Sequence, residues 1–220
     1  MNFKDHQFLL YAFALAALIL SRIPVIGKFF RSTNTLIHES GHAIVTLLTS
    51  GSVLSIDLNA DTSGAATTQS RYWLFKILIA LAGYFFSSAT AFLLFYLISK
   101  EKYTWVFYTF CAFAIVNLLF WVRNAYGIFW LLLFSAILGW VFYYNNPSYM
   151  YATAVFFSGI VLFESIFSAA TICWISMNDP SNSGDATSLR DFTYIPAPIW
   201  GMFFLAQAIY FAYLTVKLFI

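Results

Sequence analysis

Long apolar stretches alternate with short polar breaks along almost the whole chain. A membrane-spanning helix needs about 20 mainly apolar residues, because each residue adds about 1.5 Å across a hydrocarbon layer about 30 Å thick. By this measure we expect six or seven membrane helices, depending on whether the short and more polar second segment crosses completely. The predicted segments are 7–26, 34–50, 74–99, 103–122, 127–145, 150–176 and 196–219.

Two of the polar breaks are informative. Residues 51–71 lack a helical apolar stripe, and weak alternation at 53–58 followed by turn-forming residues at 61–64 predicts a small β-hairpin. Residues 178–195 are rich in Asn, Asp, Pro and Gly, which predicts a break in helical structure. The expected fold is therefore an all-α polytopic integral membrane protein with a small hairpin, forming a single domain over 1–220.

Composition excludes several other classes of protein. Hydrophobic residues make up 61% of the chain and charged residues 9%, whereas soluble domains carry about 25% charged residues. We therefore expect the surface to face membrane lipid. The net charge is +2 and no basic run is present, so the chain offers no basic patch that could bind nucleic acid. Cys111 and Cys173 lie far apart in apolar stretches and are expected to pack between helices.

The sequence His-Glu-Ser-Gly-His at 38–42 holds two of the three histidines of the chain. On a helix, His38 and His42 lie about 40° apart on one face, where both can bind one Zn²⁺ at about 2.0–2.1 Å. Glu39 is placed to accept a proton from the attacking water and pass it to the leaving amine. Thr33 or Asn34 is expected to cap this helix.

A catalytic zinc needs a third protein ligand and keeps its fourth position open. The remaining histidine, His6, is too close to the N-terminus to be a good candidate. Glu164 lies deep in an apolar segment, where ionisable groups are usually functional. Asp185 stands between the small residues Gly184 and Ala186 in the second polar break. Spacing and composition leave Glu164 and Asp185 both open as the third ligand.

The motif on an early membrane helix, followed by the late stretch Asn-Ser-Gly-Asp-Ala at 182–186, resembles the site-2 protease family of intramembrane zinc metallopeptidases, especially its compact bacterial branch. The resemblance implies that Asp185 is the third ligand of one zinc per chain. It also implies that Asn178 or Asn182 is a candidate to stabilise the oxyanion, and that residues 52–69 form a hairpin aligning an extended substrate. The location implied is the bacterial inner membrane.

Further residues have candidate roles beside the motif. Arg123 and Asn124 resemble a polar pair of the same family, and Glu164 is placed to orient a histidine ligand by a hydrogen bond. If Asp185 is a ligand, residues 178–191 must fold inward to reach the histidines.

The sequence thus predicts a zinc-dependent endopeptidase that hydrolyses membrane-embedded or juxtamembrane segments of other membrane proteins. Membrane lipid surrounds it, and any regulatory partners are other proteins. One alternative is a membrane zinc peptidase with Glu164 as the third ligand. The other is a non-enzymatic metal-binding transporter or scaffold, which has no need of Glu39.

Overall fold

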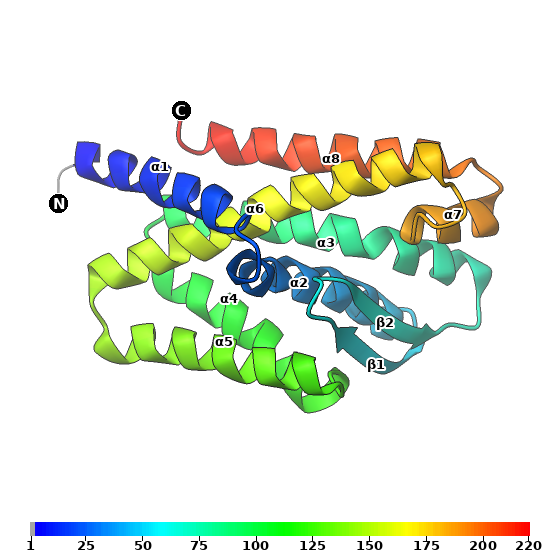
Figure 1. The fold of residues 1–220 in the computed structure, drawn as a ribbon, viewed down its shortest axis with the longest axis horizontal. Coiled ribbons are helices and arrows are strands. Elements are labelled where there is room, and N and C mark those ends of the chain that lie inside the picture. Colours follow the sequence, from blue (N-terminus) through cyan, green and yellow to red (C-terminus); the bar gives the residue numbers. More distant parts are fainter. Residues whose placement is uncertain (1–2) are drawn as a thin grey trace.

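Eight α-helices, a π-helical turn and a two-stranded hairpin form the computed structural model, which describes residues 3–220, with side chains from residue 8 onward (Figure 1). This arrangement confirms the predicted all-helical fold with a hairpin after the motif helix. The elements are α1 (Phe3–Leu20), α2 (Ile26–Leu48), β1 (Ser52–Leu58), β2 (Gly64–Gln69), α3 (Trp73–Ser99), α4 (Tyr103–Val116), η1 (Asn117–Trp121), α5 (Ala125–Tyr144), α6 (Pro147–Asn178), α7 (Asp185–Thr193) and α8 (Ala197–Lys217).

Five helices of the described chain are long and apolar enough to cross a membrane, which makes the chain an integral membrane protein. They are α3, α4 with its continuation η1, α5, α6 and α8. Helix α1 contributes a shorter apolar stretch, Phe8–Leu20. Helix α2 does not belong to this group, since it carries lysine, arginine, glutamate and two histidines among its apolar residues.

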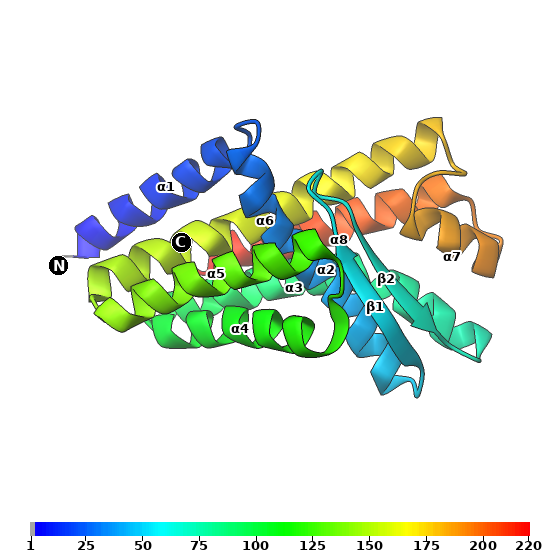
Figure 2. The same cartoon turned by 60° about the horizontal axis from the view of Figure 1, so that its bottom comes forward.

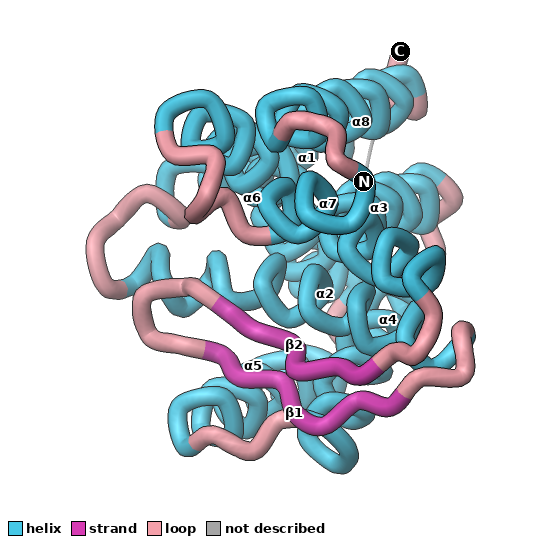
Figure 3. Tube along the Cα trace, turned by 90° about the vertical axis from the view of Figure 1, so that its right-hand side faces the viewer, coloured by secondary structure: helices cyan, strands magenta, loops and turns pink. Residues whose placement is uncertain are grey.

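Helix α2 lies in the middle of the molecule, between α3, α6 and the hairpin (Figures 1 and 3). It begins at Ile26 and not at residue 34, so the predicted cap is wrong. Thr33 and Asn34 lie buried inside the helix, and Val25 precedes the first turn without a side-chain cap. Their polarity resembled a helix end, but both side chains are buried where α2 packs against its neighbours.

Small residues allow α2 to approach its neighbours closely. A Cβ on Gly41 would lie 2.7 Å from the Cβ of Phe86 on α3, closer than side chains normally approach. On the preceding residue, the Ser40 hydroxyl accepts a hydrogen bond of 2.7 Å from the Asn117 amide of η1. Polar and apolar contacts together therefore fix α2 against the apolar bundle.

Large aromatic side chains fill the core between α2 and the second half of the bundle. Trp130 stacks on Phe134 with ring centroids 4.9 Å apart, and Phe157 of α6 packs edge-on against Phe134 at 5.3 Å. The indole N–H of Trp130 donates to the Phe29 carbonyl of α2 at 2.8 Å. This hydrogen bond satisfies the buried indole and joins α5 to the first turn of α2.

The hairpin runs along α2, and its two strands pair antiparallel (Figure 2). Its turn is held to the helix by a hydrogen bond of 2.8 Å from the Thr35 hydroxyl to the Thr62 carbonyl. Its open end lies near Thr46, because a Cβ on Gly51 would meet both the Gln69 carbonyl of β2 and the Thr46 side chain. Strand β2 therefore runs in the same direction as α2.

The outer edge of β1 is occupied by the connection between η1 and α5. Ile56 forms a parallel bridge with Val122, and the Asn124 amide both donates to the Leu58 carbonyl and accepts from the Leu58 N–H. Among the strands of the described chain, only β2 therefore keeps an unpaired edge. The predicted segment 103–122 is thus not uniformly α-helical, because its last turn widens to the π-helix η1 before this connection.

The polar break at 178–195 contains a short helix that the sequence did not suggest. The chain is irregular from Asp179 to Gly184, as predicted, and Gly184 adopts a positive φ of 53°. Helix α7 then begins at Asp185, with Ala186 and Leu189 buried against the bundle. A positive φ is readily available to glycine, so Gly184 sets the direction in which α7 leaves the loop.

We predict that Asn124→Ala loosens the hairpin, because it removes both hydrogen bonds to the buried Leu58 backbone. Leaving these groups unpaired costs about 1–3 kcal/mol. Hydrogen–deuterium exchange of residues 52–69 should therefore become at least about tenfold faster, since tenfold corresponds to about 1.4 kcal/mol. The matched control is Asn178→Ala, because the Asn178 amide bonds only the Trp174 carbonyl of its own helix. Unchanged exchange in Asn124→Ala would contradict this account of the hairpin.

Candidate metal centre

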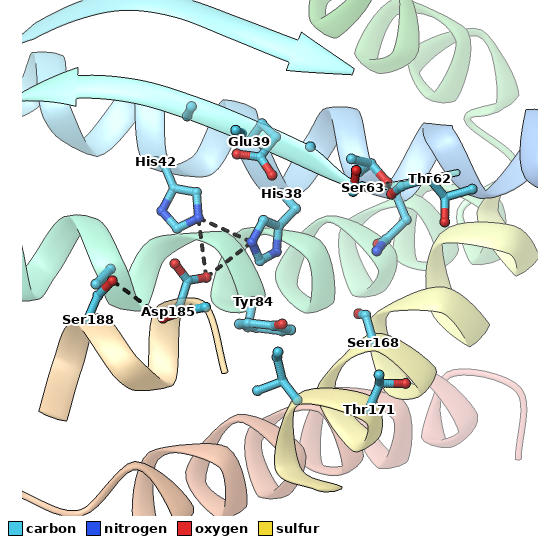
Figure 4. A pocket seen from close by; sticks show the side chains of 18 of the residues that line it. His38, Glu39, His42, Thr62, Ser63, Tyr84, Ser168, Thr171, Asp185 and Ser188 are labelled. Atoms are coloured by element: carbon cyan, nitrogen blue, oxygen red, sulfur yellow. Dashed lines mark hydrogen bonds and ion pairs between the residues drawn. The ribbon is translucent and has the colours of Figure 1, made fainter. Parts of the chain in front are cut away.

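The imidazoles of His38 and His42 meet the carboxylate of Asp185 at the start of α7 (Figure 4). The Nε2 atoms of the two histidines lie 3.1 Å apart. Asp185 Oδ2 lies 3.2 Å from Nε2 of His38 and 3.4 Å from Nε2 of His42. Three potential ligand atoms, from two segments of the chain more than 140 residues apart, thus converge on one point.

This spacing fits a tetrahedral metal ion. Ligand atoms about 2.0–2.2 Å from one zinc lie about 3.3–3.6 Å apart in tetrahedral geometry. The three observed separations fall within a few tenths of an ångström of that range. Two imidazoles and one carboxylate are also a donor set that zinc accepts, with the fourth position left for water or substrate. The residues present therefore fit the ion.

Neighbouring groups of α3 hold the two imidazoles in this orientation. The Nδ1 atom of His42 donates to the Ile79 carbonyl at 2.7 Å, which orients the ring so that its Nε2 atom faces Asp185. A Cβ on Gly83 would lie 2.5 Å from Nε2 of both His38 and His42. Tyr84 packs edge-on against the His38 ring with centroids 4.6 Å apart. The absence of a side chain at Gly83 therefore makes the room in which the rings sit.

Glu39 lies beside the imidazoles and under the hairpin (Figure 4). Its side chain is buried, and a Cβ on Gly64 would lie 2.8 Å from its Oε1 atom. Burial raises the pKa of Glu39, although the charges of His38 and His42 act in the opposite direction. A carboxylate whose pKa is raised toward neutrality is a better proton acceptor and donor.

Asp185 is held in its charged form. Burial alone would raise the pKa of Asp185, but the positive charge of His42 and the hydrogen bonds from His38 and His42 hold the pKa below its usual range. Its position in the first turn of α7 also places a negative charge at the positive end of a helix dipole. The ionised form is the one that binds a metal.

The three groups and Glu39 open on a cavity of about 930 Å³. Helices α2, α3, α6 and α7 and strand β2 all contribute to its walls. Ser168 and Thr171 of α6 lie across from the imidazoles in Figure 4. The cavity is large enough for a segment of peptide to reach the candidate metal centre.

Glu164 also lines this cavity but does not approach the histidines. Its Oε1 atom forms an ion pair with the guanidinium of Arg22, which precedes α2. In the described part of the chain, Asp185 is therefore the acid that meets both imidazoles, and Glu164 is neither beside them nor hydrogen-bonded to either. The side chain of His6 lies outside the described residues.

Three other predicted residues lie away from the cavity. Asn182 is exposed and donates to the Asp179 carboxylate at 2.7 Å. Arg123 donates to carbonyls at the end of η1, including Phe120 at 2.8 Å. Asn124 holds β1, as described above. The structure brings none of the three to the candidate metal centre.

Several residues of the site could not be chosen from the sequence. Ile79 acts through its backbone carbonyl, which every residue possesses, and Tyr84 is one of fourteen tyrosines. Gly83 and Gly64 offered a signal, because glycine is unfavourable inside helices and strands and often marks a close approach. What approaches each glycine depends on the tertiary structure.

Comparison with known proteins identifies the family. The chain matches the family described as Peptidase M50B-like over residues 10–215. The comparison with curated proteins gave no match, and neither did the comparison with solved structures. The matched range includes both the motif at 38–42 and Asp185, and it confirms the resemblance to site-2 proteases. A match over nearly the whole length shows that the chain belongs to the Peptidase M50B-like family of membrane peptidases.

Proposed function

We propose that the protein is a zinc-dependent intramembrane endopeptidase, acting as one membrane-embedded domain over 1–220. The observation that carries the proposal is the convergence of His38, His42 and Asp185 at tetrahedral spacing next to the buried Glu39. Membership of a peptidase family supports hydrolysis of a peptide bond as the reaction. The substrates are membrane-embedded or juxtamembrane segments of other proteins, and the setting is the bacterial inner membrane.

The three side chains would hold one zinc ion, and Glu39 would move the proton. A bound zinc ion supplies Lewis acidity, which polarises the peptide carbonyl and lowers the pKa of a nearby water. Glu39 accepts a proton from the attacking water and delivers it to the leaving amine. His42 keeps its orientation through Ile79, so that its Nε2 remains a ligand atom.

The unpaired edge of β2 is the proposed place for the substrate backbone. Residues of β2 and its turn line the cavity, and Gly64 packs directly against Glu39. A peptide added to this edge would be extended, which exposes its peptide bonds for hydrolysis. The edge of β1 is not available, because the connection around Val122 and Asn124 covers it.

The first prediction from this proposed function concerns the metal. Purified protein should contain about one zinc per chain, and His38→Ala, His42→Ala and Asp185→Ala should each lose most of it, because each removes one of three ligands. Metal analysis by mass spectrometry measures this directly. Glu164→Gln is the matched control and should retain zinc. Full occupancy in Asp185→Ala with loss in Glu164→Gln would favour the alternative ligand.

The second prediction concerns proton transfer. Glu39→Gln keeps the shape of the side chain but cannot accept a proton, so cleavage should slow by at least about 10²-fold while zinc content stays unchanged. The rate is measured with purified protein in lipid nanodiscs and a membrane peptide substrate. Cleavage at the wild-type rate would remove Glu39 from the mechanism, whereas a wild-type protein that binds metal but cleaves no peptide would favour a metal-binding transporter or scaffold.

The third prediction concerns the space beside the imidazoles. Gly83→Ala places a Cβ against both Nε2 atoms and should weaken zinc binding by about 10–100-fold, the effect typical of misoriented ligands. The matched control is Gly139→Ala, which lies inside α5 with nothing within 4 Å of the added Cβ. Both changes favour helix formation by about 1 kcal/mol, so a loss confined to Gly83→Ala reports the site and not the helix. Equal zinc affinity in the two variants would contradict the packing argument.

A further inference from the structure

The cavity extends from the candidate metal centre to a second polar region near the start of α2. Arg31, Asn34 and His38 all line it and lie on the same side of that helix. Arg31 is seven residues before His38, so the two side chains leave the helix about 10.5 Å apart along its axis. One continuous cavity therefore joins a cationic side chain to the candidate metal centre.

Arg31 has no acidic partner among the described residues. Its half-buried side chain makes no ion pair there, and its buried Nε atom has no hydrogen-bond partner. Four acidic residues line the cavity, and two of them, Glu39 and Asp185, lie at the candidate metal centre. Glu164 is paired with Arg22, and Asp61 accepts hydrogen bonds from Ser63 at the hairpin turn.

A second arginine adds to the positive charge of this region. Arg22 stacks over the ring of Phe167 at 4.1 Å while it pairs with Glu164. Burial lowers the pKa of Arg22, and the nearby charge of Arg31 lowers it further. Glu164 pairs with Arg22, so the guanidinium of Arg31 faces the partly enclosed cavity without an ion-pair partner among the described residues. A charge removed from water is costly unless it is paired, so this region favours an anion.

The direction of β2 indicates where such an anion would come from. Strand β2 starts beside Thr35 and Glu39 and runs in the same direction as α2, away from Arg31. A peptide added to its free edge would pass Glu39 and continue past the start of the strand toward Arg31. An extended peptide rises about 3.3 Å per residue, so about 10.5 Å corresponds to about three residues.

We propose that Arg31, supported by Arg22, forms a subsite that binds an acidic side chain of the substrate about three residues from the cleaved bond. The inference rests on the proposed endopeptidase function and specifies its substrate class. Arg31 provides a planar guanidinium that can bind a carboxylate through two hydrogen bonds. This subsite could not be predicted from the sequence, because Arg22 and Arg31 are separated from Glu164 by more than half of the chain.

The test uses synthetic membrane peptides that share one apolar sequence and carry a single Glu, Gln or Lys at successive positions. Cleavage by full-length protein in zwitterionic nanodiscs is followed by mass spectrometry, which locates the cut bond. For the wild type, the cut should move with Glu and stay about three residues from it. The Glu peptide should be cleaved at least about tenfold faster than the Gln peptide, as a charge-assisted contact implies.

Arg31→Gln should remove this preference, so that this variant cleaves the Glu and Gln peptides at equal rates; Arg and Gln have similar helix propensities, so the change should not disturb α2. Arg31→Glu should prefer the Lys peptide. The matched control is Arg123→Gln, which removes an arginine outside the cavity and should keep the Glu preference. Zinc content of each variant reports that the protein is folded.

Binding provides a readout that does not need catalysis. In the Glu39→Gln background, fluorescence anisotropy should show the Glu peptide bound about tenfold more tightly than the Gln peptide, and Arg31→Gln should equalise the two. Equal binding of the Glu and Gln peptides by Glu39→Gln protein overturns the subsite, whether or not the wild type cleaves. Cleavage without any Glu preference overturns it as well and leaves the endopeptidase proposal standing.

One further outcome would assign Arg31 to lipid. If cleavage depended on Arg31 only in nanodiscs containing phosphatidylglycerol, and the position of Glu had no effect, the residue would bind a lipid phosphate and the substrate subsite would be wrong. Failure of the wild type to cleave any peptide, with the Glu preference in binding intact, would count against the endopeptidase function and in favour of the subsite.

Discussion

The central constraint on this structure is the burial of the polar helix α2 inside an apolar bundle. A helix that carries Glu39, His38 and His42 needs partners for each polar group, because lipid offers none. The surrounding elements supply several of them: Ile79 accepts from His42, Asn117 donates to Ser40, and Thr35 donates to the hairpin turn. Helices α3, α6 and α7 and the hairpin therefore have positions that follow from what α2 requires.

Two glycines convert this packing into a site. Gly83 on α3 leaves room for both imidazoles, and Gly64 on β2 lets the strand lie directly on Glu39. In each case the chemistry-bearing side chain occupies the volume in which a Cβ would stand. The backbone of the neighbouring element thus comes close enough to orient the residue. This close approach explains how short loops and a nine-residue helix suffice to assemble the centre.

The same cavity joins catalysis to substrate recognition in our proposals. Strand β2 provides the unpaired edge, and Glu39 and the proposed metal ligands lie beside its start. Arg31 lies two helical turns before His38, toward the N-terminus of α2. An extended peptide following β2 would meet these features in a fixed order. The distance between Arg31 and His38 along α2 then sets the distance, along the substrate, between the bound acidic residue and the cleaved bond. A single arginine can therefore select the position of cleavage.

The amino-acid sequence by itself determined the membrane class, most of the helical segments and the His-Glu-Ser-Gly-His motif. Each of these depends on local properties: apolar length, turn-forming residues, and the four-residue spacing that places His38 and His42 on one face. The hairpin also followed from local alternation and turn residues. The true start of α2 could not be predicted in this way, because Thr33 and Asn34 have the polarity of a helix cap although both lie buried inside the helix.

Only the tertiary structure decided which acid meets the histidines. Spacing and composition left Glu164 and Asp185 equally available as the third ligand. The positive φ of Gly184 and the burial of Ala186 and Leu189 bring Asp185 to α2, whereas the loop before α2 brings Arg22 to Glu164. These pairings join residues far apart in the chain, and their distances are set by helix packing, which no local pattern encodes.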